Sequence, residues 1–144
     1  HTIRFNEEIS GYGHEDTVFG INLKRSKTSI LHIDNPSVHL GLEPCFDFLQ
    51  KSEQSVINLT KLMQNAPDLR KELEKTVKIL RVFKFLRFLG LVLLLRWVFR
   101  VINPAIRRSL CSRYPSLIMF DLYKLALLAK LYTKGWMASL SKYF

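Results

Sequence analysis

The sequence predicts a predominantly α-helical protein with a short α+β segment at its N-terminus. From residue 44 onward, apolar residues recur at the spacing of helix faces. Before that point, a glycine-containing turn, a short helical pattern and an apolar run typical of a strand share 43 residues. The formal charge divides at the same place, because residues 1–43 carry −2 and residues 44–144 carry +12. We therefore expect two regions, 1–43 and 44–144, with different roles.

The N-terminal region is expected to contain one helix and one strand. The glycines of the turn at Gly11 to His14 allow tight backbone angles and close approach to a ligand. A helix over residues 15–26 begins with Glu15 and Asp16, whose carboxylates suit the positive end of a helix. An apolar run, Ser29 to Ile33, is then typical of a buried strand.

Four helices are expected in residues 44–144. The pattern predicts a first helix to about Gln64 that starts at Pro44, since proline is favoured in the first turn. A long helix over 68–102, with a bend near Gly90, is expected to end at Asn103-Pro104. Shorter segments follow over 105–112 and from Leu117 to Tyr132 or beyond. This last helix is apolar almost all round, which predicts burial against the long helix or against a second copy of the chain.

A carboxylate at the turn is the first candidate catalytic group. Asp16 lies at a helix start, where it could act as a general base, and Glu15 beside it could bind a ligand. The ring of Tyr12 offers an apolar face on which a sugar can pack. The alternative is that Glu15 and Asp16 only stabilise the helix N-terminus.

These residues also carry a resemblance to a known family. The motif Gly11-Tyr12-Gly13-His14-Glu15-Asp16 and the segment from Ile30 to Glu43 resemble the C-terminal part of the catalytic domain of family 2 glycosyltransferases, which are inverting enzymes of the GT-A fold. The resemblance implies that residues 1–43 are the end of a GT-A domain, with Asp16 as catalytic base and Glu15 at the acceptor. It also implies that Gly11, Tyr12, Gly13 and His14 bind the acceptor. No Asp-x-Asp motif is present, so the chain is expected to be part of a longer enzyme and inactive alone.

The resemblance further implies a divalent cation, Mn²⁺ or Mg²⁺. In such enzymes a histidine beyond the Glu-Asp helix ligates the metal, which neutralises the diphosphate leaving group. His39 is the expected ligand because it follows the apolar run, and His32 competes for this role. The other metal ligands and the site for the nucleotide sugar would lie outside the chain. A glycan or a lipid-linked molecule would be the acceptor, in the synthesis of surface polysaccharide.

The basic helical region predicts a peripheral contact with an anionic membrane. Lysines and arginines recur through residues 71–100, and the longest uncharged apolar run, Phe88 to Leu95, is far shorter than the ~20 residues that span a bilayer. Such a helix suits the membrane interface, as do the aromatic residues Trp97, Phe99, Tyr123, Tyr132 and Trp136. The alternative is an ordinary packed helix with a solvated basic face. Nucleic acid is not expected as a partner, because the aromatic residues lie among aliphatic ones.

The two cysteines, Cys45 and Cys111, are far apart in sequence and have no metal-ligand spacing. They are therefore expected to remain separate thiols in a reducing compartment. With the basic helices, this predicts a cytoplasmic protein at the inner face of the membrane. A homo-oligomer through the C-terminal helices is a further expectation. The alternative to a glycosyltransferase is a non-catalytic basic helical module that binds a membrane surface or partner helices.

Overall fold

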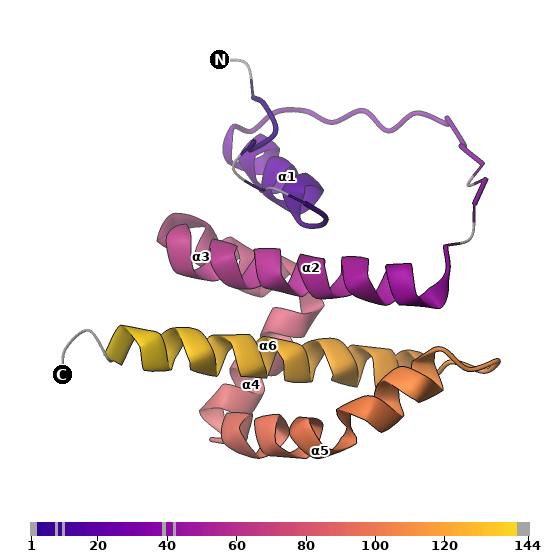
Figure 1. The fold of residues 1–144 in the computed structure, drawn as a ribbon. Coiled ribbons are helices and arrows are strands. Elements are labelled where there is room, and N and C mark those ends of the chain that lie inside the picture. Colours follow the sequence, from indigo (N-terminus) through magenta and orange to yellow (C-terminus); the bar gives the residue numbers. More distant parts are fainter. Residues whose placement is uncertain (1–2, 8, 10, 39, 42, 141–144) are drawn as a thin grey trace.

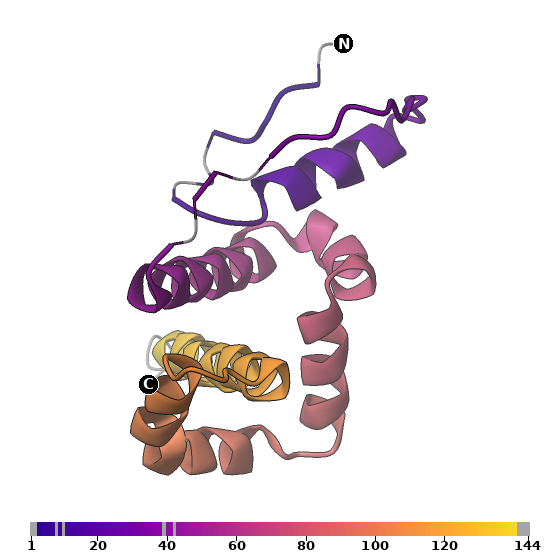
Figure 2. The same ribbon diagram turned by 90° about the vertical axis from the view of Figure 1, so that its right-hand side faces the viewer.

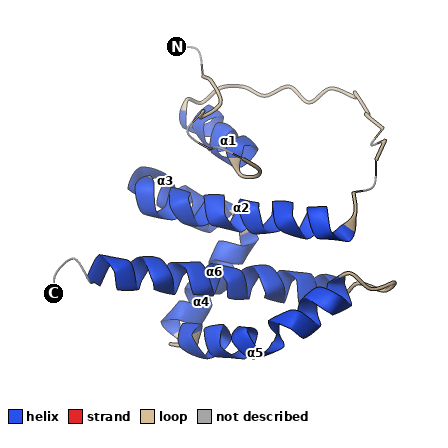
Figure 3. Cartoon of the chain, viewed as in Figure 1, coloured by secondary structure: helices blue, strands red, loops and turns tan. Residues whose placement is uncertain are grey.

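The computed structural model describes residues 3–7, 9, 11–38, 40, 41 and 43–140. Within these ranges the chain forms six helices and no strand (Figures 1 and 3). The helices are α1 (Glu15–Arg25), α2 (Cys45–Asn65), α3 (Pro67–Thr76), α4 (Lys78–Phe88), α5 (Val92–Leu110) and α6 (Leu117–Leu140). The predominantly α-helical fold is thus confirmed.

The helix α6 lies at the centre of the fold. In Figure 2, α2, α3, α4 and α5 follow one another around it like the sides of a frame, and α6 passes through the middle. It packs along α5 and α2 and also contacts α4. Leu128 and Ala129 of α6 are completely buried, as is Leu73 of α3. The packing expected for an apolar last helix is therefore supplied by helices of the same chain.

The helices α2, α5 and α6 share a second, smaller core. Leu49 of α2, Phe99 and Ile106 of α5, and Tyr123 of α6 are buried together there. At its edge Cys45 and Cys111 form a disulfide, with 5.5 Å between their Cα atoms. The expectation of two separate thiols was wrong, because folding around α6 brings the start of α2 to the end of α5.

A polar cluster joins the same three helices. The hydroxyl of Tyr123 donates a hydrogen bond to Oε1 of Glu53, and Nη1 of Arg107 approaches the same oxygen at 2.8 Å. Burial of the ring and the hydrogen bond to Glu53 raise the pKa of Tyr123 above its usual value. Glu53 therefore satisfies a buried hydroxyl and a cation at once, which fixes α2 against α5 and α6.

The expected long helix over 68–102 is divided into α3, α4 and the first part of α5. Val77 has extended backbone angles, with φ −89° and ψ 112°, and so ends α3. Gly90 has a positive φ of 72° and lies between α4 and α5. At these two positions the chain changes direction, so that α3 packs against α2 while α4 and α5 pack against α6 (Figure 2). One straight helix of this length could not do so.

The expected interruption at Asn103-Pro104 is absent, because α5 continues to Leu110. Proline removes one backbone hydrogen bond within a helix and costs about 3 kcal/mol there. Buried contacts of Ile106 and Leu110 on the far side of the proline hold the helix together.

The strand expected at Ser29 to Ile33 is not formed. Residues 29–38 are an irregular segment, in which Leu31 is 85% exposed and Ile33 72% exposed. A strand needs a neighbour for its backbone hydrogen bonds, and none of the described residues forms another strand. The α+β character expected for the N-terminal region is therefore not seen.

Candidate functional site

The turn at Gly11 to Gly13 lies against α2. The side-chain amide of Asn58, which is buried, donates a hydrogen bond of 3.1 Å to the carbonyl oxygen of Tyr12. Gln54 donates in turn to Oδ1 of Asn58. Both glycines have positive φ angles, 86° and 101°. The turn is thus held by α2. Because its glycines have no side chains, the backbone of the turn can lie close to α2.

Replacing Gly13 by alanine should destabilise the protein by about 2–4 kcal/mol, from overpacking and a left-handed backbone. A Cβ atom at Gly13 would lie 2.5 Å from Oγ and 2.6 Å from Cβ of Ser55. Urea unfolding followed by circular dichroism measures the change. Gly20→Ala is the matched control, since a Cβ there meets nothing within 4 Å. In the middle of α1 it should stabilise by about 0.5–1 kcal/mol. Equal effects of the two substitutions would contradict this account of the turn.

The ring of Tyr12 is 55% exposed and borders an open pocket of about 480 Å³. The pocket is lined by carboxylates, amides and one ammonium group, namely Glu43, Asp47, Gln50, Lys51 and Gln54. Nζ of Lys51 lies 5.7 Å from the centre of the Tyr12 ring and pairs with Glu43, which raises the pKa of the lysine. An exposed ring beside planar polar groups is suited to a polyhydroxylated ligand such as a sugar.

Glu15 and Asp16 occupy the first turn of α1, as expected. Asp16 is exposed, and its Oδ1 accepts a hydrogen bond of 2.7 Å from the backbone N–H of Thr17. Glu15 is half-buried, and its Oε2 is buried without a partner among the described residues. The two carboxylates therefore differ in environment, and Asp16 is the one that a solvent-borne ligand can reach.

His14 lies at a different pocket from Tyr12. It lines a mainly apolar cavity of about 450 Å³ between α2, α4 and α6, with Leu59, Val82 and Leu125 among its walls. Burial lowers the pKa of His14, against the opposing effect of Asp16 and Glu15. The turn thus directs two of the expected acceptor-binding residues into separate pockets.

The expected metal ligand, His39, lies outside the described residues. His32, the alternative, is exposed in the irregular segment. In the part of the chain that the structure describes, no group of three His, Cys, Asp or Glu side chains could hold a metal ion. These residues alone therefore do not fit a complete metal site.

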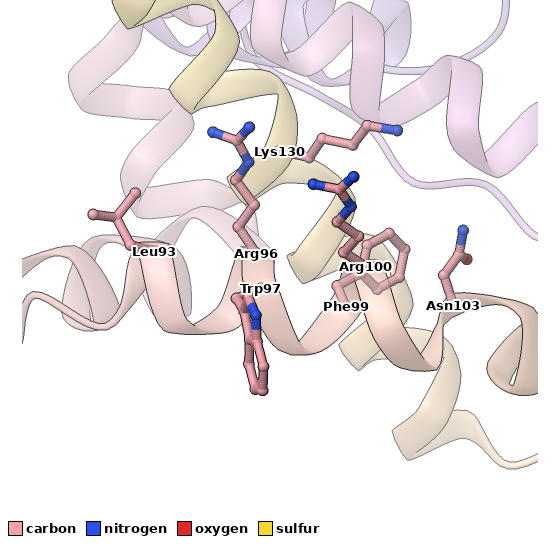
Figure 4. A pocket seen from close by; sticks show the side chains of 7 residues that line it. All are labelled: Leu93, Arg96, Trp97, Phe99, Arg100, Asn103 and Lys130. Carbon is pink, nitrogen blue, oxygen red and sulfur yellow. The ribbon is translucent and has the colours of Figure 1, made fainter.

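A basic pocket of about 440 Å³ lies between α5 and α6 (Figure 4). Arg96 and Arg100 extend from α5 toward α6, where Lys130 lies, and Trp97 points away on the other side of α5. Nη1 of Arg96 is 3.2 Å from Oγ1 of Thr133. Arg100 and Lys130 form no ion pair with the described residues. Asn103 also lines the pocket, and its buried Oδ1 has no partner in the described ranges.

An exposed apolar surface lies next to this pocket, on the end of α4 and on α5. It consists of Phe85, Phe88, Leu89, Leu91, Leu93, Leu94, Trp97 and Val101, which are 37–86% exposed. Among the other aromatic residues expected at a membrane, Phe99 and Tyr123 are instead buried in the core, and the side chain of Trp136 lies outside the described residues. None of the helices in the described ranges combines the length and apolar character needed to cross a bilayer.

Several residues of the Tyr12 pocket and of the basic pocket were not singled out from the sequence. Asp47, Gln50 and Gln54 follow one another at steps of three and four on α2, a spacing that places them on one helix face. Lys130 comes to the basic pocket from a helix that the sequence marks as apolar, so no local pattern points to it.

Comparison of the chain with family models, with curated proteins and with solved structures finds no match.

Proposed function

We propose that this chain is the C-terminal, acceptor-binding portion of an inverting glycosyltransferase similar to family 2. The observation that carries the proposal is the exposed ring of Tyr12 at the edge of a polar pocket, four residues before the exposed carboxylate of Asp16. A sugar bound on the ring could hydrogen-bond to the amides and carboxylates of α2. The substrates would be a nucleotide sugar and a glycan or lipid-linked acceptor of surface polysaccharide synthesis.

In this proposal Asp16 takes the proton from the acceptor hydroxyl as that oxygen attacks the anomeric carbon of the donor. Glu15, beside Asp16 in the first turn of α1, would contact the acceptor. A divalent cation, Mn²⁺ or Mg²⁺, would neutralise the diphosphate leaving group, with His39 as one ligand and the others outside this chain. The irregular segment 29–38, with its exposed apolar side chains, would then be covered by the rest of the GT-A domain.

Tyr12→Ala should weaken the binding of uncharged β-linked oligosaccharides to the 144-residue chain by about fivefold, because an aromatic contact with a ligand contributes about 1 kcal/mol. Amide chemical shifts of Gln50, Lys51 and Gln54, followed by NMR during titration with such a panel, measure the affinity. Tyr114→Ala is the control, because that ring is also exposed, at 81%, and does not line the Tyr12 pocket. Binding that causes no shifts at these three amides would count against the acceptor site.

A second candidate function is binding to an anionic membrane surface, and the exposed apolar surface beside the basic pocket favours it. Residues 78–144 carry thirteen Lys/Arg and a single Asp, a net charge of +12. A surface that joins large apolar side chains to cations is typical of helices that lie in the membrane interface. In a glycosyltransferase this contact would hold the enzyme at the inner face of the membrane, near lipid-linked acceptors. Without catalysis, the same surface would define a basic membrane-binding module.

A further inference from the structure

We infer that the pocket between α5 and α6 binds the phosphate of an anionic phospholipid headgroup. The inference rests on the membrane contact proposed above and gives it a defined site. Arginine and lysine side chains are the usual protein ligands of phosphate, and arginine binds its oxygens through paired N–H donors. Three such cations, Arg96, Arg100 and Lys130, line one pocket of about 440 Å³.

The cations are arranged for binding before a ligand arrives. Thr133 accepts a hydrogen bond from Arg96 and so holds that guanidinium near the pocket. Arg100 and Lys130 are exposed and form no ion pair within the described part of the chain, so their charges are not neutralised by a neighbouring carboxylate. The sequences of α5 and α6 contain a single acidic residue, Asp121, which pairs with Lys124 at 2.9 Å. The pocket therefore keeps a strong positive potential.

The position of the pocket favours a membrane lipid over a phosphate compound in solution. Leu93 and Trp97 border the pocket and belong to the exposed apolar surface, where they are 68% and 66% exposed. If that surface lies among acyl chains, the cations of the neighbouring helix face reach the level of the headgroup phosphates. Asn103, whose Oδ1 has no partner among the described residues, would accept a hydrogen bond from a headgroup hydroxyl. Phosphatidylglycerol supplies both groups.

Co-sedimentation with vesicles tests the site, with phosphatidylcholine alone or mixed with phosphatidylglycerol at constant ionic strength. The double substitution Arg100→Gln and Lys130→Gln should lower the affinity for phosphatidylglycerol vesicles by about 30-fold, since each basic residue near the surface contributes about fivefold. The matched control is Lys71→Gln with Lys75→Gln, which removes two exposed charges from α3, a helix that does not line the pocket. The affinity of this control for phosphatidylglycerol vesicles should fall by no more than about threefold.

The outcomes separate the pocket from the membrane contact itself. Equal losses in the two double variants would overturn the pocket, because the attraction would then follow net charge alone, and the membrane contact would stand. Absence of wild-type binding to both kinds of vesicle would overturn both proposals. Circular dichroism and the unfolding midpoint verify that the variants fold, as expected for exposed side chains.

Discussion

Under the proposed function, Asp16→Asn should lower the rate of sugar transfer by the complete enzyme by about two to four orders of magnitude, because a general base contributes about that much to such reactions. Asparagine cannot take up the acceptor proton at neutral pH. The limb of the pH–rate profile that reports ionisation of the base should also disappear. Release of nucleoside diphosphate from a panel of nucleotide sugars, in the presence of acceptor lipid extract, measures the rate.

The structure makes this substitution a clean test of chemistry. Asp16 is exposed and uses Oδ1 to accept the N–H of Thr17, and the amide oxygen of asparagine can accept the same hydrogen bond. The fold should therefore persist. Asp34→Asn, which removes an equal charge from the exposed segment, is the control and should leave the rate unchanged. Full activity of Asp16→Asn would remove the assigned base and leave the membrane-binding module as the leading function.

The sequence predicted those helices whose signals are local. Glu15 and Asp16 mark the start of α1, and Pro44 directly precedes α2. In each case the residue type acts on the backbone of its own turn, so no knowledge of the rest of the fold is needed. The central helix α6 was also predicted, because a segment that is apolar all round must be covered.

The errors concern positions that packing decides. The apolar spacing runs without a break across Val77, yet the chain turns there, which lets α3 pack against α2 while α4 and α5 pack against α6. Pro104 was expected to interrupt the helix, but α5 continues through it. Buried residues on both sides of the proline outweigh the local cost of the lost hydrogen bond. The strand at 29–33 depends on pairing partners that this chain does not provide in its described residues.

The sequence named candidate site residues, and the structure shows an arrangement of them that the sequence did not predict. From the sequence, the glycines were expected to let the backbone approach a ligand. In the structure, the missing side chain of Gly13 instead lets the turn lie close to Ser55 of α2. The signal that could have revealed this is Asn58, a polar residue on the buried face of α2, which needs a hydrogen-bond partner from another segment. Tyr12 and His14 are two residues apart, but the turn sends their side chains to different pockets.

Removal of the disulfide should lower the free energy of unfolding by about 4 kcal/mol, from the loss of a constraint on the unfolded chain. The bond joins residues 66 positions apart, Cys45 at the start of α2 and Cys111 after α5. The small core beside it contains only a few buried side chains. Urea unfolding of the double variant Cys45→Ser with Cys111→Ser measures the effect. Dithiothreitol should destabilise the wild type by a similar amount and leave the variant unchanged.

The same cysteine pair tests where the protein resides. Disulfides persist in oxidising compartments and are rare in a reducing cytoplasm. In a protein at the inner face of the membrane, both cysteines should therefore be free thiols. Its fold would lack the cross-link and would be less stable by about 4 kcal/mol. Acid quenching of intact cells, followed by alkylation with a mass-tagged maleimide, counts the free thiols. Two modified cysteines would agree with the inner face. A fully oxidised pair would place the protein outside the cytoplasm, and would require the lipid-linked acceptor and the anionic lipid headgroup to be sought there.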